Sequence, residues 1–272
     1  MPLCRMFLLL TAVLIAPIAQ AQTAQTADQA TQPLTFDVVT IKPHDQSVRP
    51  NAWTLQPTPD GYTAANVSLL KLVSQAYGIF DPKLITGGPP WIDKDKFDLE
   101  AKFDPSEIPN AKDLTYRQRS DMLRAVLADR FHLKGHFETK EFPVFNLVIA
   151  KGGPKLQQAK PENIDDNGIG ITCHVTRQLS GVTQRRGCTV ASLTDLLLYN
   201  TGRTVIDKTG LTGHYDFELH WTPEDATPAQ ALQYSGPSIF TAVQEQLGLK
   251  LEPATDPLDI LVIDSAEPPT PN

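Results

Sequence analysis

Apolar and polar residues alternate along several short segments of the chain, a pattern typical of strands that bury one face. Two segments show it most clearly, residues 96–103 (KFDLEAKF) and residues 214–221 (HYDFELHW). In the second segment, the side chains expected to point inward are those of Tyr215, Phe217, Leu219 and Trp221. Further strands are predicted over residues 36–41, 53–56, 62–64, 132–137, 144–150, 249–251 and 258–263.

Between these strands, apolar residues recur at three- and four-residue spacing, which predicts amphipathic helices. Asn66 is expected to cap the first helix and Gly78 to end it. The second helix is predicted to begin at a capping box formed by Thr115 and Gln118. Two more helices are predicted in the second half of the chain, one bounded by Thr189 and Gly202 and one running from Pro237 to Gly248.

The order of elements is the same in the two halves of the chain, which predicts an internal repeat. Short segments also match, namely FDLE with YDFE, LRAV with FTAV, and NLVIAK with ILVIDS. Each repeat would contain a strand, a helix, a strand, a helix and a hairpin. We therefore expect an α+β fold in which antiparallel sheets are covered by helices. The repeats are predicted at residues 36–151 and 172–268, with a hinge at 152–171 and a tail at 269–272.

The first 21 residues have the features of an export signal. Arg5 provides the positive charge, residues 6–18 form the apolar stretch, and residues 19–21 (AQA) fit the cleavage rule. The apolar stretch is short for a membrane span, although an uncleaved anchor is the alternative. Residues 22–35 are polar and of low complexity, which predicts a disordered spacer. We expect a mature protein without a membrane span, located in the periplasm or secreted.

Charge and cysteine content narrow the classes of partner. The 272 residues carry a formal charge of -7 and contain no basic run, which argues against nucleic acid and anionic membranes. Cys173 and Cys188 remain after signal cleavage, and we expect them to form a disulfide in an oxidising compartment. The segment between them predicts a hairpin that turns at Ser180–Gly181, with a bulge that adjusts the pairing of the cysteines. His174 lies beside Cys173, but no further ligands are spaced for a metal site.

The tetrapeptide Asp207–Lys208–Thr209–Gly210 matches the phosphate-accepting signature of cation-pumping ATPases. Phosphoryl transfer would also need ATP, Mg²⁺ and further acidic residues to hold the metal. The sequence contains no phosphate-binding glycine-rich loop with a lysine. Asp and Thr side chains commonly bond to nearby backbone N–H groups in turns, and glycine permits positive φ. We interpret the tetrapeptide as a structural turn, and we expect no cofactor.

Other candidates for chemistry lie on the predicted strands. His132 and His136 would be about 13 Å apart on a strand, which is too far for one metal ion. Two acidic pairs would each be about 6.6 Å apart, within the range that glycoside hydrolases use. These pairs are Asp98 with Glu100, and Asp216 with Glu218. Because polar residues alternate with apolar ones in both strands, we interpret the carboxylates as parts of solvated faces. The sequence has no Gly-x-Ser-x-Gly motif, so a serine esterase of that type lacks support. With the cysteines assigned to structure as well, no catalytic residue is predicted.

Longer segments resemble a large family of secreted proteins of unknown function, known chiefly from soil acidobacteria. They are FDVVTIKP, ITGGPPWIDKDKFDLEAK, MLRAVLADRFHLKGHFETKEFPVFNLVIAKGGPKL, VIDKTGLTGHYDFELHW and IFTAVQEQLGLKLEPATDPLDILVID. The resemblance covers residues 36–266 and implies no established activity. Within these segments, we take as candidate binding residues Asp207, Lys208, Thr209, Gly210, Trp91 and Asp93.

The helix and hairpin predicted at the end of each half more loosely resemble the short N-terminal domain of secretins and TonB-dependent receptors. Such periplasmic modules bind protein segments, often by strand addition. Our main hypothesis is an exported, non-enzymatic module that binds an envelope protein or a cell-wall component, along strand edges or in a cleft between the halves. One alternative is a glycan hydrolase that uses the strand-borne carboxylates. Another is a sensor that binds a small ligand between the repeats.

Overall fold

The computed structural model describes residues 34–48, 52–104, 106, 108, 114–164, 173–179, 181–224, 226–227 and 236–270. These residues belong to one compact unit, Pro33–Asn272. The predicted signal peptide and most of the predicted spacer lie outside the described residues. A search of the described helices finds none with the length and apolar character needed to cross a membrane.

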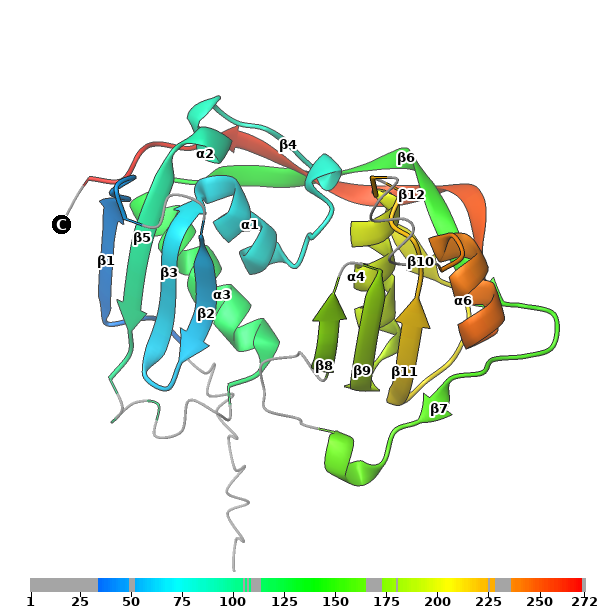
Figure 1. The fold of residues 1–272 in the computed structure, drawn as a ribbon. Helices are drawn as coiled ribbons and strands as arrows, with labels where there is room; N and C mark the ends of the chain where they lie inside the picture. The colour runs from blue at the N-terminus through cyan, green and yellow to red at the C-terminus, as the bar shows by residue number, and fades with distance from the viewer. Residues whose placement is uncertain are drawn as a thin grey trace, which may run out of the picture. The chain divides into compact units, whose positions relative to one another are not determined.

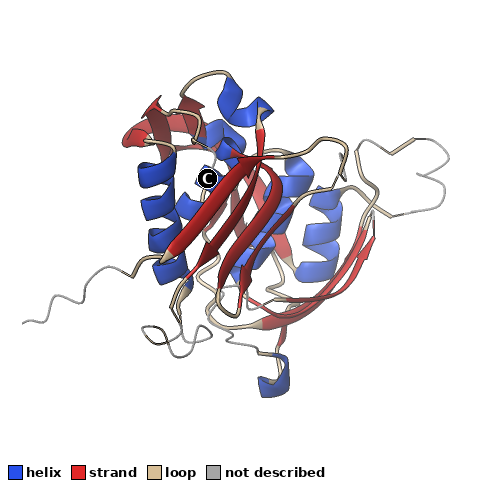
Figure 2. Cartoon of the chain, turned by 90° about the vertical axis from the view of Figure 1, so that its left-hand side faces the viewer, coloured by secondary structure: helices blue, strands red, loops and turns tan. Residues whose placement is uncertain are grey.

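The α+β prediction is confirmed, since the described residues form five helices and three four-stranded sheets. The first sheet is antiparallel and has the order β1-β5-β3-β2. Its strands are β1 (Val38–Pro43), β2 (Thr54–Thr58), β3 (Gly61–Ser68) and β5 (Lys96–Lys102). Helices α1 (Leu69–Tyr77) and α3 (Tyr116–Arg130) bury their apolar residues against one face of this sheet (Figures 1 and 2). We call these elements, with η1 (Pro82–Leu84) and α2 (Trp91–Lys94), the first half.

A third sheet, also antiparallel, has the order β7-β11-β9-β8. Its strands are β7 (Gln157–Gln158), β8 (His174–Leu179), β9 (Val182–Cys188) and β11 (Tyr215–His220). Helices α4 (Val190–Thr201) and α6 (Ile239–Leu247) contribute to its apolar core. We call these elements, with η3 (Pro161–Asn163), the second half. As the sequence predicts, Phe217, Leu219 and Trp221 are buried in this core.

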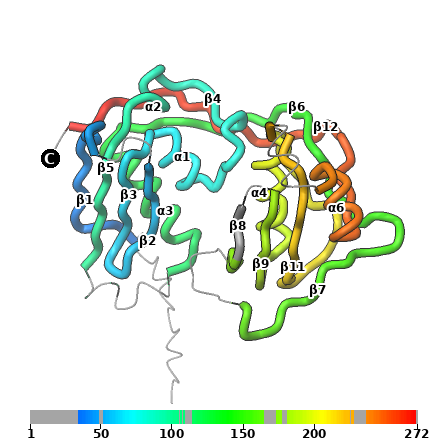
Figure 3. Tube along the Cα trace, in the orientation of Figure 1, coloured from blue at the N-terminus to red at the C-terminus, as the bar shows by residue number. Residues whose placement is uncertain are grey.

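The middle sheet shows that the predicted hairpins are wrong. Each half was expected to end in two short strands that pair with each other, but each pair is one continuous strand, β6 (Lys134–Ile149) or β12 (Leu249–Ser265). These two strands pair with each other along almost their whole length, antiparallel (Figure 3). The short strands β4 (Ile85–Gly87) and β10 (Val205–Asp207) join at opposite edges in parallel, giving the order β10-β6-β12-β4.

Prolines made the two long strands look interrupted in the sequence. Phe145 donates its N–H to Thr204 O at 2.9 Å, away from β12, and Pro143 has the same orientation because it lies two positions earlier. Pro253 lies opposite Phe145, and Pro257 lies four positions further along the same strand. All three prolines therefore occupy positions whose N–H would point away from the partner strand. The ladder between β6 and β12 loses no hydrogen bond to them, so the strands continue.

The middle sheet repeats its own contacts. The N–H of Gly88, which follows β4, donates to Ile263 O at 2.8 Å. The N–H of Lys208, which follows β10, donates to Leu147 O at 2.9 Å. Strand β4, from the first part of the sequence, therefore pairs with β12, from the last part. Strand β10 pairs in the same way with β6, which comes earlier in the sequence. The core of the first half contains Leu261 and Ile263 of β12, whereas the core of the second half contains Leu147 of β6.

Most predicted helix ends are confirmed, and two starts are corrected. Ser68, not Asn66, caps α1, because its side chain accepts the N–H of Lys71. Ser238, not Pro237, precedes the first residue of α6 and caps it. The confirmed ends are the Thr115–Gln118 capping box, the Thr189 cap, and the left-handed glycines Gly78, Gly202 and Gly248.

The exchange of strands predicts that a residue near the end of the chain stabilises the first half. Leu261 is 2% exposed and packs in the first core. Leu261→Ala should lower the free energy of unfolding by about 2–5 kcal/mol, because it leaves a cavity in that core. Denaturant unfolding measures this change, and hydrogen exchange should show the loss of protection in β3 and β5. The neighbouring Val262→Ala, at a half-buried position, should cost less, and equal losses would contradict the assignment.

The equivalence of the halves also predicts a stabilising substitution. His132, just after α3, has φ 46°, a left-handed conformation that Gly248 adopts after α6 with φ 66°. Because a side chain costs roughly 1 kcal/mol in this region, His132→Gly should raise the free energy of unfolding by up to about 1 kcal/mol. Gly248→Ala is the matched control and should destabilise, since its Cβ would lie 2.2 Å from Gly153 O. A loss of stability in His132→Gly would argue against backbone strain there.

Candidate functional site

A cleft of about 460 Å³ lies between the two halves, which is within the range of small-ligand sites. Its walls come from α1, the loop after α1, α3, β9 and α4. We call it the inter-half cleft, and its lining residues are Gln75, Gly78, Phe80, Tyr116, Cys173, Arg185, Ser192, Asp195, Leu196 and Tyr199. Tyr199 is 88% exposed and Phe80 is 46% exposed, so two large aromatic side chains of the cleft face solvent.

The first-half wall is built by the end of α1 and the start of α3. Gly78 ends α1 with φ 67°, a conformation that turns the chain toward Phe80. Tyr116 is the first residue of α3, and its hydroxyl donates to Gln75 O at 3.1 Å. This hydrogen bond joins the two helices beneath the cleft and fixes the tyrosine ring in its wall.

The second-half wall is one face of α4. Ser192, Asp195, Leu196 and Tyr199 are spaced by three or four residues, so their side chains lie on the same side of the helix. Burial raises the pKa of Asp195, while the positive charge of Arg185 acts in the opposite direction. Burial also lowers the pKa of Arg185. The cleft therefore contains a carboxylate, of Asp195, and a guanidinium, of Arg185, and both groups are partly shielded from water.

Two polar contacts connect the halves next to the cleft. Asp81 is 5% exposed, and its carboxylate accepts the N–H of Lys83 at 3.0 Å and the hydroxyl of Thr204 at 2.6 Å. The ammonium of Lys83 donates to Gly202 O at 2.6 Å. A smaller hollow of about 190 Å³ beside these contacts shares Phe80 with the cleft. The loop after α1 is therefore anchored to the second half by a buried carboxylate.

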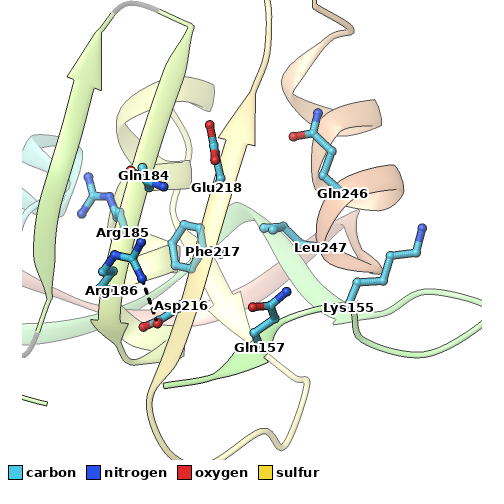
Figure 4. A pocket seen from close by; sticks show the side chains of 10 residues that line it. All are labelled: Lys155, Gln157, Gln184, Arg185, Arg186, Asp216, Phe217, Glu218, Gln246 and Leu247. Carbon is cyan, nitrogen blue, oxygen red and sulfur yellow. Dashed lines mark ion pairs between the residues drawn. The ribbon is translucent and has the colours of Figure 1, made fainter. Parts of the chain in front are cut away.

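A second pocket, of about 310 Å³, lies beside β11 and is lined mostly by polar side chains (Figure 4). We call it the edge pocket, and its lining residues are Lys155, Gln157, Gln184, Arg185, Arg186, Asp216, Phe217, Glu218, Gln246 and Leu247. The amide of Gln246, from the end of α6, accepts the N–H of His220 at 2.9 Å and donates to His220 O at 2.7 Å. A side chain therefore makes, at this point of β11, the two bonds that a neighbouring strand would make.

The Asp207–Gly210 tetrapeptide forms a turn at the end of β10. One carboxylate oxygen of Asp207 accepts the N–H of Thr209 at 2.8 Å and its hydroxyl at 2.7 Å. The hydroxyl oxygen of Thr209 accepts the N–H of Leu211 at 3.1 Å, and Gly210 has φ 67°. These bonds fit the turn that the sequence predicts, and Asp207 and Lys208 are exposed. A binding role for the four residues stays a prediction.

The other two candidate binding residues lie far from this turn. Trp91, at the start of α2, is half-buried, and its ring lies against Phe97 and Phe131 at 6.2 and 6.4 Å between centroids. Asp93 is exposed on the same short helix. Strands β10 and β4, which precede the two groups, join the middle sheet about ten residues apart along β6, or roughly 33 Å. The structure does not bring the two groups into one site.

The acidic pairs have a structural role that the alternation pattern did not reveal. Asp98 accepts the N–H of Asn66 at 3.0 Å and contacts the buried ring of His44 at 2.6 Å. At the equivalent place in the second half, Asp216 accepts the N–H of Gly187 at 2.8 Å. Asn66 and Gly187 both have positive φ and lie at irregularities in strand pairing. The interpretation of these two aspartates as solvated is therefore wrong, since each holds a strand distortion before a helix.

Glu100 and Glu218, the other members of the pairs, are exposed and contact Lys102 at 3.0 Å and His220 at 2.6 Å. His132 and His136 are exposed, as expected. Hydrogen bonds with the carboxylates of Asp264 and Glu138 raise the pKa of His136. Within the described residues, no three His, Cys, Asp or Glu side chains are grouped so as to hold a metal ion.

The predicted disulfide is confirmed. Cys173 and Cys188 are bonded, with 4.2 Å between their Cα atoms. Strands β8 and β9 form the predicted hairpin, with a shift in pairing between Val175 and Arg177 where a bulge was expected. Of the predicted turn, Gly181 has φ 75° and Ser180 lies outside the described residues. The bond anchors the start of β8 to the end of β9, so it holds one wall of the inter-half cleft.

Comparison with known proteins places this fold in a family. The family described as "Protein of unknown function (DUF3738)" matches residues 70–266, which is more than half of the chain. The chain belongs to the DUF3738 family. No curated protein and no solved structure matches it. The DUF3738 match runs from α1 through the whole of β12, so it spans both walls of the inter-half cleft and the edge pocket, whereas β1, β2 and β3 precede it.

Sequence reasoning missed the residues that line the inter-half cleft in this DUF3738 chain. Phe80 and Tyr199 belong to different halves, and no spacing rule links them. The available signal was Tyr199, a large aromatic residue on the predicted polar side of the helix after Thr189. The apolar periodicity of that helix gives this tyrosine no place in the core. The likeness to secretin and TonB domains rested on terminal hairpins, and the structure has continuous strands in their place.

The raised pKa of Asp195 predicts a pH dependence. An acid whose pKa is higher in the folded state favours the folded state most when protonated, below its ordinary value of 3.8. Asp195→Asn should therefore match the native stability below pH 3.8 and exceed it at neutral pH, by less than about 1 kcal/mol because water still screens this partly exposed carboxylate. Thermal unfolding at several pH values measures the difference. A gap that stays constant with pH would contradict the assignment.

Proposed function

We propose that this DUF3738 protein is an exported, non-enzymatic binding module that holds its ligand in the inter-half cleft. The observation that supports the proposal is the cleft itself, which combines exposed aromatic rings with a partly desolvated acid and base. In a free protein, the contact of exposed aromatic side chains with water is unfavourable. Such side chains are common at sites where a ligand covers them. Aromatic faces and hydrogen-bonding groups together suit a ligand with both apolar and polar surfaces.

The carboxylates favour binding over turnover. Asp98 and Asp216 already accept backbone N–H groups, and Asp207 accepts bonds within its own turn. A hydrolase that used the strand-borne pairs would need these groups free to protonate a substrate or to activate water. Their structural hydrogen bonds therefore support the module over the glycan hydrolase, which stays the alternative.

The export signal and the spacer that the sequence predicts support a location in the periplasm or outside the cell. The ligand we propose is therefore a cell-wall component or a segment of an envelope protein. If the ligand is small and soluble, the same cleft would act as a sensor, because residues from both halves would contact it.

Binding can be tested by thermal shift with soluble peptidoglycan fragments and with short polysaccharides. A ligand at about 100 times its Kd should add about 2.7 kcal/mol of stability. Tyr199→Ala should weaken binding about tenfold or more, because it removes an aromatic contact surface, with little change in the stability of the free protein. Trp53→Ala is the control, since Trp53 is 56% exposed outside the cleft.

Three outcomes separate the alternatives. Equal loss of binding in both variants would contradict a site in the cleft. Release of new reducing ends from a polysaccharide would favour the hydrolase, and its loss after Asp216→Asn would strengthen that reading. Absence of binding to wall fragments, together with failure to retain any protein from an envelope extract, would remove support for the module.

A further inference from the structure

The two antiparallel sheets are equivalent strand by strand. In the first sheet, β3 pairs with β5 so that Ala64 faces Leu99, with a shift before the next paired residues. In the third sheet, β9 pairs with β11 so that Arg185 faces Phe217, with a shift at the same place. Phe217 of β11 therefore corresponds to Leu99 of β5. The remaining outer strands correspond as well, β7 to β1 and β8 to β2.

One of these corresponding pairs differs in length. Strand β1 pairs with all of β5, from Pro43 opposite Phe97 to Val38 opposite Lys102. Strand β7 pairs only with Tyr215 and Asp216 at the start of β11. The rest of β11, residues 217–220, corresponds to the part of β5 that Val38–Ile41 covers. Among the described residues, the second half therefore has an open strand edge where β1 pairs in the first half.

The backbone of Glu218 points toward this open side. On one side of β11, Trp221 donates its N–H to Gly181 O at 2.8 Å, beside β9. On the other side, His220 bonds to Gln246, and Ala159 donates its N–H to His214 O at 2.8 Å. Orientation alternates along an antiparallel strand, so Glu218 faces the same side as residues 214 and 220. Among the described residues, no strand pairs with Glu218 on that side.

The edge pocket occupies this position. It is lined by Gln157, where β7 ends its pairing, by Glu218, and by Gln246 and Leu247 of α6. Figure 4 shows Gln157 and Gln246 on the same side of β11, away from the arginines of β9. The space is therefore bounded by the last paired residue of β7 at one end and by the Gln246 amide at the other.

The residue that corresponds to Gln246 in the first half contacts the seated strand directly. Arg130, at the end of α3, donates from Nη2 to Val39 O of β1 at 3.1 Å. Gln246, at the end of α6, bonds instead to the N–H and C=O of His220. The side-chain amide of Gln246 thus bonds to the backbone groups that His220 presents at the open edge. Two positions earlier on the same edge lie the backbone groups of Glu218.

We propose that the edge of β11 at residues 217–220 binds an extended segment of a partner protein as an added strand. The segment runs antiparallel to β11, in line with β7, and pairs with Glu218 through two backbone hydrogen bonds. Strand β1 defines the side chains that suit this place, because Ile41 is 2% exposed opposite Leu99 and Thr40 faces Glu100. The partner segment carries an apolar residue opposite Phe217 and a small polar one opposite Glu218. None of residues 217–220 lines the inter-half cleft, although Arg185 lines both pockets, and the proposal does not depend on a ligand in the cleft.

A synthetic peptide with the sequence of residues 36–43 (FDVVTIKP) is the probe, because β1 occupies the corresponding place in the first half. Bound to the intact mature protein, it should slow hydrogen exchange of the Glu218 amide, measured by NMR. Gln246→Ala should tighten binding at least threefold, since the competing amide is removed. The same peptide N-methylated at the Thr40 nitrogen should bind at least tenfold more weakly, because it lacks the N–H that pairs with Glu218.

The N-methylated peptide leaves the protein unchanged, so its result does not depend on folding of a variant. Thermal unfolding of Gln246→Ala checks that the variant is folded. Equal binding of the two peptides, or protection at Glu100 and not at Glu218, would overturn the proposal. So would the absence of any binding to Gln246→Ala, the variant with the most open edge.

Discussion

The ladder between β6 and β12 is the constraint on which the rest of the structure depends. It joins two segments that lie a hundred or more residues apart in the chain and pairs them along almost the full length of both strands. Each strand begins beside one core and ends beside the other, so the two cores share their middle sheet. The hydrogen bonds, and not a flexible linker, set where the halves meet. The cleft between α1 and α4 exists because this ladder holds both helices in place.

The outer sheets of the two halves have corresponding strand orders, so equivalent positions can be compared. An aspartate holds a distorted strand before the first helix in both halves, once through Asn66 and once through Gly187. Differences between the two halves are then informative. Contacts that both halves make explain the fold, and features found in one half suggest function. The exposed aromatic residue on α4 and the short β7 are features of the second half alone. Both of the surfaces proposed for binding involve that half.

Local patterns predicted the elements but not their partners. Alternation located β5 and β11, and capping residues located both ends of α4, because these signals depend on neighbours in the sequence. The long strands were divided at Pro143, Pro253 and Pro257, since a proline is tolerated only where its missing N–H faces outward. That orientation depends on pairing with a distant strand and cannot be read locally. The cleft was missed for the same reason, as Phe80 and Tyr199 meet only through tertiary contacts.

The seating of Leu261 and Ile263 in the first core has a consequence for how the protein is made. The chain is synthesised from its N-terminus, so β1 to α3 are made long before the strand that completes their core. Apolar residues of β1 to α3 therefore stay uncovered until synthesis is almost finished. The first core can therefore be completed only late in synthesis, which favours chaperone contact with its apolar residues before then.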